Sequence, residues 1–209
     1  MSNFSIQIFQ LIVLYSSMVV HEVSHGLMAY KLGDPTAKLA GRLSFNPLKH
    51  IDPFGTVILP LFLILFNSPF VICYAKPVPF NPSNFRNVKK GIFLTGLAGP
   101  LSNIFLAVIF SILIRLLSFF GVLSSSFLIF LFIIVLLNVL FAFFNLAPFP
   151  PFDGHHLVFS ILPNKYYKVK NFLIRNDLFL MLIWVFLIFP YLFAPLVYKF
   201  SLFLTGLSL

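Results

Sequence analysis

The most constraining feature of the sequence is a histidine motif inside a long apolar run. The run extends from Phe4 to Leu32, and its C-terminal half contains the segment His21-Glu22-Val23-Ser24-His25. Histidines four residues apart on a helix lie on one face about one turn apart, so both imidazoles can bind one ion. Ionisable groups in a lipid-buried helix each cost several kcal/mol unless they are paired or hydrated. We therefore interpret the motif as a metal site.

Glu22 is the only glutamate in the chain. In hydrolytic zinc sites with the H-E-x-x-H pattern, the glutamate is not a ligand but takes a proton from zinc-bound water. The pattern is short and also occurs by chance in proteins that are not enzymes. Its position in an apolar helix favours the metal interpretation, and we expect one zinc ion per chain with His21 and His25 as ligands and Glu22 as the base.

The composition indicates an integral membrane protein. Hydrophobic residues make up 60% of the chain and charged residues 9%, whereas an ordinary soluble domain has about 25% charged residues. The net charge of +9 is spread over short loops that flank apolar runs, as expected of basic residues on the cytoplasmic side of a membrane. No aromatic-basic nucleic-acid module is visible, so the lipid bilayer is the expected partner and nucleic acid is not. Cys73 is the only cysteine, which excludes an internal disulfide and a cysteine-based zinc site.

Four apolar runs are long enough to cross a bilayer, which takes about 20 residues. They cover residues 5–30, 92–120, 127–146 and 178–204. A further run, residues 54–75, is interrupted by prolines into pieces that are too short to cross. We therefore predict an all-α polytopic protein with four full spans plus a re-entrant segment, and a short β element at residues 36–45. It forms a single domain over residues 1–209, with a catalytic core at about 5–160 and a C-terminal span at about 178–204.

The re-entrant interpretation of residues 54–75 follows from distance and charge. If this run crossed the membrane, His25 and Asp153 would end at opposite surfaces, up to ~30 Å apart. Zinc–ligand bonds are only about 2 Å long, so one ion could not join these residues. With a re-entrant run, every basic loop from Lys31 to Arg175 lies on one face, which the positive-inside rule makes the cytoplasmic face. We expect a multi-pass protein of the cell membrane, of bacterial inner-membrane type, with its active site toward the cytoplasm.

A catalytic zinc site usually has three protein ligands, and the third is open at this point. Asp34 and Asp52 belong to turns, where Asx hydrogen bonds account for them, and Asp177 is expected to be the N-cap of the last helix. Asp153 follows three prolines in a stretch where a regular helix cannot continue. Irregular backbone at membrane depth is tolerated only inside protein or beside a wet cavity. Asp153 is therefore the favoured third ligand.

Other polar residues near these runs have competing interpretations. His155 or His156 could be the third ligand instead, or could orient a ligating carboxylate, although an interfacial histidine pair explains them more simply. Asn145 stands at the end of the fourth run and could donate a hydrogen bond to a developing oxyanion. For Asn103 and Asn138 a hydrogen bond between helices is the preferred interpretation.

These residues resemble the site-2 protease family of intramembrane zinc metalloproteases, in its compact branch without a PDZ domain. The similarity runs over most of the chain, and its combined motifs are far more specific than H-E-x-x-H alone. The matching segments are His21-Glu22-x-x-His25, Gly33-Asp34-Pro35-Thr36-Ala37, Gly41-Arg42-Leu43, residues 46–53 with Gly55-Thr56, residues 75–79, Ala98-Gly99-Pro100-x-Ser102-Asn103, and Asn145-Leu146-x-Pro148-x-Pro150-Pro151-x-Asp153-Gly154. Phe152 and His155 depart from the usual leucine and small residue.

The resemblance implies a zinc-dependent metalloendopeptidase with His21, His25 and Asp153 as zinc ligands, Glu22 as base and Asn145 near the substrate carbonyl. It further implies hydrolysis of transmembrane protein substrates within or near the bilayer, as in regulated intramembrane proteolysis. The alternative from the residues is a metal transporter or a metal-binding membrane protein without protease activity. A transporter has no need of a base that is not a ligand, so we prefer the protease.

Overall fold

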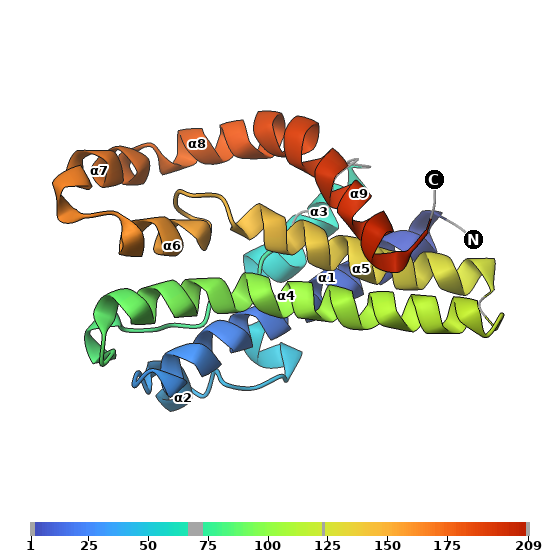
Figure 1. Cartoon of the computed structure of the whole chain (residues 1–209), viewed down its shortest axis with the longest axis horizontal. Coiled ribbons are helices and arrows are strands. Elements are labelled where there is room, and N and C mark those ends of the chain that lie inside the picture. Colours follow the sequence, from blue (N-terminus) through green and yellow to red (C-terminus); the bar gives the residue numbers. More distant parts are fainter. Residues whose placement is uncertain (1–2, 67–72, 123, 208–209) are drawn as a thin grey trace. The chain divides into compact units, whose positions relative to one another are not determined.

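The computed structural model describes the chain except residues 1–2, 67–72, 123 and 208–209 (Figure 1). Over the described residues the structure contains helices and no strand. Four helices are long and apolar enough to cross a membrane: Ser5–Lys31, Val88–Phe119, Ser125–Asn145 and Asp177–Thr205. The prediction of an all-α polytopic protein with four spans is confirmed. The chain divides into two compact units, residues 1–91 and 92–209.

The first unit is built on the long helix α1. Its elements are α1 (Asn3–Lys31), α2 (Thr36–Leu39), the 3-10 helix η1 (Pro47–His50), the π-helix η2 (Pro53–Ile58), α3 (Leu59–Leu65), the 3-10 helix η3 (Pro82–Asn84) and the first turn of α4 (Val88–Phe119). Helix α1 ends at Lys31, and the chain turns at Gly33, whose φ of 110° lies in the left-handed region that glycine adopts without strain. The following amide, Asp34 N–H, donates to the Ala29 carbonyl at 2.9 Å and closes the last turn.

The prediction of a β element at residues 36–45 is wrong. Thr36–Leu39 forms the helical turn α2, and no strand is present between residues 40 and 45. The Asp34 carboxylate accepts from the Thr36 amide at 3.1 Å. This side-chain bond takes up an amide at the start of the turn, as an N-terminal cap does, and the residues that follow have no β-branched side chain to oppose a helix.

The two ends of the expected re-entrant segment lie side by side. The Tyr74 amide donates to the Gly55 carbonyl at 3.1 Å, and the Lys76 amide donates to the His50 carbonyl at 2.9 Å. Between them, η2 and α3 form an apolar helix too short to cross a bilayer. The chain thus returns to the place where it entered, as the re-entrant prediction requires. The turn itself, at residues 67–72, lies outside the described part of the chain.

Asp34 ties two loops of the first unit together. Its carboxylate is fully buried and accepts from the Asn81 amide at 2.6 Å and from Asn84 Nδ2 at 2.7 Å, in addition to Thr36. Burial alone would raise the pKa of Asp34, but the hydrogen bonds from Asn84, Thr36 and Asn81 together lower it below its ordinary value. The predicted turn role of Asp34 is confirmed, and the turn also anchors the segment at residues 81–84.

We expect Asp34→Asn to destabilise the protein at pH 7 by about 1–3 kcal/mol, because the amide places a donor against the buried donors of Asn81 and Asn84. A carboxylate with a lowered folded-state pKa stabilises above its unfolded pKa of about 3.9, and this contribution is lost as the pH falls through the folded value. The difference in thermal midpoint between wild type and variant in detergent should therefore shrink on acidification below about pH 4. An equal difference at pH 7 and pH 3 would contradict this role.

The second unit contains the remaining spans. Its elements are α4 from residue 92 onward, α5 (Ser125–Asn145), α6 (Gly154–Ile161), the 3-10 helix η4 (Asn164–Tyr166), α7 (Tyr167–Arg175), α8 (Asp177–Ile183), the π-helix η5 (Trp184–Phe193) and α9 (Ala194–Thr205). Asn103 on α4 donates to Asn138 on α5 at 3.1 Å, and both side chains are fully buried. The predicted hydrogen bond between helices is confirmed. Asp177 is the first residue of α8, so the residue at the N-cap is Asn176 rather than Asp177.

Candidate metal centre

Helix α1 brings the two motif histidines together. His21 and His25 are 2% and 7% exposed, and their Nε2 atoms lie 3.0 Å apart. Two zinc–nitrogen bonds of about 2.0–2.1 Å bring the two nitrogens to within about 4 Å of each other. The spacing therefore fits a single shared zinc ion, as the i, i+4 register predicts.

Glu22 is held by a backbone group from a distant part of the first unit. Its Oε2 accepts from the Val78 amide at 2.7 Å, across 56 residues of sequence. Pro77 and Pro79 have no N–H, so Val78 supplies the only amide of this tripeptide. The contact fixes the carboxylate on the helix that carries both histidines. Sequence reasoning missed Val78, although its position between two prolines was a visible signal.

Arg42 holds the segment that leads to Val78. Its guanidinium donates to the Lys49 carbonyl and, at 2.7 Å, to the Lys76 carbonyl. The Lys76 amide in turn donates to His50 at 2.9 Å. These bonds clamp Lys76 to the loop at 42–50 through both its carbonyl and its amide, two residues before Val78. Arg42 belongs to the motif Gly41-Arg42-Leu43, for which the sequence alone suggested no role.

Asp153 stands in the second unit at the start of α6. Its side chain is half-buried, and the loop before it is packed by aromatic side chains: the Phe152 ring lies 4.9 Å from Phe144 and 5.6 Å from Phe149, edge to face in both cases. A Cβ added to Gly154 would lie 2.3 Å from the Leu146 carbonyl oxygen. The backbone at residues 146–147 therefore approaches Gly154 closely, and this contact fixes the turn that carries Asp153.

The other predicted site residues lie beside this loop. Asn145 is the last residue of α5, and its amide donates to the Phe141 carbonyl of the same helix at 3.0 Å. The His155 and His156 rings are tilted by 39° with their centroids 3.8 Å apart, and His155 Nδ1 lies 2.6 Å from the Phe152 carbonyl oxygen. Thus Asn145, Asp153, His155 and His156 belong to one unit, and His21, Glu22 and His25 to the other.

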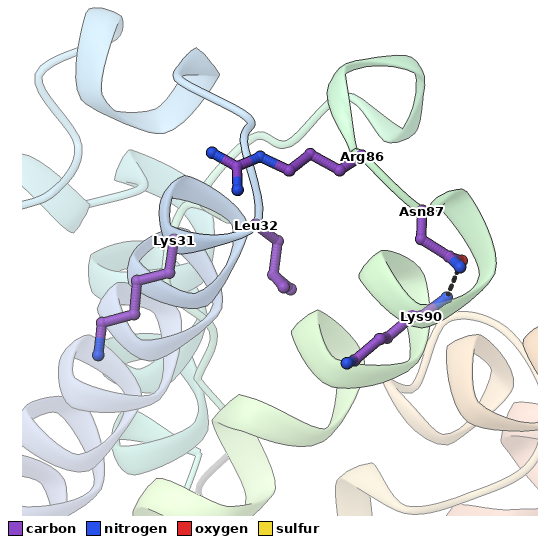
Figure 2. A pocket seen from close by; sticks show the side chains of 5 residues that line it. All are labelled: Lys31, Leu32, Arg86, Asn87 and Lys90. Atoms are coloured by element: carbon purple, nitrogen blue, oxygen red, sulfur yellow. Dashed lines mark hydrogen bonds between the residues drawn. The ribbon is translucent and has the colours of Figure 1, made fainter.

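The first unit also contains a basic pocket. It is lined by Lys31, Leu32, Arg86, Asn87 and Lys90, at the end of α1 and the start of α4 (Figure 2). Figure 2 also shows that Asn87 caps the start of α4: the Lys90 amide donates a hydrogen bond to Asn87 Oδ1. The distance between these two atoms is 3.1 Å. The pocket contains none of the predicted site residues.

The site on α1 is of the H-E-x-x-H metallopeptidase type, embedded in a membrane. It is defined by the histidine pair, the glutamate beside it and the long apolar helix that carries all three. A family model described as Peptidase family M50 matches residues 120–184. A Bacillus subtilis (strain 168) protein whose name describes a zinc metalloprotease, YwhC, is 37% identical over 164 residues, 76% of this chain and 71% of the relative. A Mycolicibacterium smegmatis protein named as zinc metalloprotease Rip2 is 27% identical over 139 residues, 66% of this chain and 51% of the relative. No solved structure matches.

The chain belongs to peptidase family M50, the site-2 protease family of zinc metalloproteases. It is a multi-pass membrane protein and a zinc-dependent metallopeptidase. The family and cofactor predictions are confirmed.

Proposed function

We propose that the enzyme hydrolyses peptide bonds of transmembrane proteins within or near the bilayer, in regulated intramembrane proteolysis. The observation that carries this proposal is the position of the motif: His21, Glu22 and His25 lie in the interior of Ser5–Lys31, a helix long and apolar enough to cross the membrane. A site on such a helix is reached most directly by a substrate that is itself in the membrane. The cell membrane is the proposed location.

We assign zinc binding to His21, His25 and Asp153. Bound zinc supplies Lewis-acid chemistry, since it lowers the pKa of water toward 7 and polarises a carbonyl group. Glu22 accepts the proton that the attacking water loses and then donates it to the leaving amine nitrogen. Asn145 uses one N–H on its own helix, and its second N–H is available to donate to the substrate carbonyl oxygen.

The substrate helix has to unwind before cleavage. Each carbonyl in a transmembrane helix accepts a backbone hydrogen bond, and in hydrocarbon that bond has no water to replace it. Residues that weaken a helix, such as glycine, lower the cost of exposing one carbonyl. We therefore expect this protease to prefer transmembrane segments that contain helix-weakening residues.

Incubation of the purified protein with model transmembrane peptides tests the function. One peptide carries a Gly-Gly pair in its apolar segment, and a matched peptide carries Leu-Leu at the same place. We expect mass spectrometry to show cleavage within the apolar segment, faster for the Gly-Gly peptide, stopped by a zinc chelator and restored by added zinc. Absence of cleavage, or cleavage that a chelator does not slow, would refute the proposal.

The proposed topology places every basic loop from Lys31 to Arg175 in the cytoplasm. The meeting ends of the re-entrant segment support it, because the loops before and after that segment then share one side. We expect single cysteines at Ala40 and Ser83 in a Cys73→Ser background to react with an impermeant thiol reagent from the cytoplasmic side. As a control, a cysteine at Ser126 should react from the opposite side. The positions Ala40, Ser83 and Ser126 are all exposed in the structure. Labelling of Ala40 and Ser83 from different sides would exclude this topology.

A further inference from the structure

We infer that Val78, seated on α1 at Gly26, positions the Glu22 carboxylate for catalysis. This inference rests on the proposed function of Glu22 as the base. Val78 and Gly26 act through Glu22, so both are positioning residues. The assignment concerns contacts within the first unit only.

The first step of the argument is the fit between Gly26 and Val78. A Cβ added to Gly26 would lie 2.8 Å from Val78 Cγ1 and 2.6 Å from Leu43 Cδ2. Carbon atoms in contact are separated by about 3.5–4.0 Å, so any larger residue at Gly26 has to displace these side chains. Val78 is 6% exposed and Gly26 is buried. Only glycine therefore lets the Val78 side chain rest directly on α1.

The second step is that Val78 contacts α1 twice. Its side chain meets Gly26, and its amide donates to Glu22, four residues earlier on the same helix. Residues four apart lie on one helix face, so both contacts come from one side of α1. Pro77 and Pro79 restrict the backbone on either side of Val78. A displacement of the Val78 side chain is therefore passed to its amide rather than absorbed by rotation of the neighbouring residues.

The third step is the consequence for the base. Glu22 is a flexible side chain with three rotatable bonds, and the Val78 amide fixes one of its oxygens. Displacement of a catalytic group by about 1 Å can reduce the rate about 10²-fold. His21 and His25 lie with their Nε2 atoms 3.0 Å apart, a spacing that follows from their i, i+4 register on α1. Loss of the Val78 contact should thus lower kcat while zinc binding persists.

The test uses Gly26→Ala in the full-length protein with the Gly-Gly transmembrane peptide. We expect kcat to fall about 10- to 10²-fold, with KM within about twofold and zinc content unchanged. The triple variant Gly26→Ala/Leu43→Ala/Val78→Ala should recover most of the rate, because it removes both Leu43 Cδ2 and Val78 Cγ1 and keeps the Val78 amide. Val78→Pro, which removes the amide, should not be active at the wild-type rate. Leu27→Ala, at a 39% exposed neighbouring position, is the matched control and should retain kcat.

Hydrogen exchange provides a readout that does not depend on activity. Val78 is the only exchangeable amide between residues 77 and 79, so a peptide spanning this stretch reports it without interference from its neighbours. We expect this amide to be protected in the wild type and to exchange at least about tenfold faster in Glu22→Ala and in Gly26→Ala. Unchanged Val78 exchange in Glu22→Ala, full kcat in Gly26→Ala, or loss of zinc in Gly26→Ala would each overturn the inference. If the wild type cleaves no transmembrane peptide, the proposed function fails, while the exchange measurement still decides the contact.

Discussion

Replacement of Glu22 by glutamine should abolish peptide hydrolysis and leave about one zinc ion bound per chain. Glutamine has the shape of glutamate, and its carbonyl oxygen can accept a hydrogen bond from the Val78 amide. It cannot take up a proton at neutral pH. General-base catalysis contributes about 10²–10⁴-fold to a rate, so we expect a loss of at least this size in kcat. The measurement is a cleavage assay on the transmembrane peptide, combined with metal analysis of the same preparation.

The control for this experiment is His25→Ala, which should lose both activity and zinc. His21 and His25 are buried with their Nε2 atoms 3.0 Å apart, so removal of one leaves a site with too few ligands. Loss of zinc in Glu22→Gln would identify Glu22 as a ligand and contradict the assignment of the base. Retention of zinc in both variants would place the metal elsewhere.

Asp153→Asn should weaken zinc binding markedly, whereas His155→Ala and His156→Ala should each retain most of it. A ligating carboxylate carries a negative charge that the neutral amide lacks, and charge from the ligands favours a divalent cation. Asp153 also stands on a turn that Gly154 and the Phe152 ring fix, as expected of a residue that delivers a ligand. Competition with a fluorescent zinc chelator measures the change in affinity.

The histidine variants discriminate between the two candidate ligand sets. The His155 and His156 rings contact each other, and His155 Nδ1 already contacts the Phe152 carbonyl oxygen. If His155→Ala or His156→Ala loses zinc and Asp153→Asn keeps it, the third ligand is a histidine. In that case the proline-rich loop positions a histidine of α6 at the metal rather than Asp153.

The sequence was sufficient where the determining forces are local or depend on composition. Long apolar runs predict the four spans because a bilayer needs about 20 apolar residues, and the structure has four such helices. The i, i+4 spacing predicts that His21 and His25 meet on one face of α1, and their Nε2 atoms lie 3.0 Å apart. The Asx turn at Asp52 is likewise local, since its carboxylate accepts from Phe54 and Gly55 at 3.1 and 2.8 Å.

Local reasoning failed where a side chain redirected the backbone. Residues 36–45 read as a short β element because polar and apolar residues alternate there. The Asp34 carboxylate, itself hydrogen-bonded by Asn81 and Asn84, instead accepts the Thr36 amide at the start of the helical turn α2. The donors at residues 81 and 84 are about fifty positions away, so no window of sequence around Asp34 contained the reason.

Only the tertiary structure decided how the proposed base is held. The amide that fixes Glu22 comes from Val78, 56 residues later, and the guanidinium that clamps the preceding backbone comes from Arg42, 34 residues before Lys76. Pairing of this kind depends on which loops meet after α1 has folded, and many loops of similar composition could supply one free amide. Sequence therefore determined the metal-binding motif and its membrane setting, whereas packing selected the single N–H that orients its carboxylate.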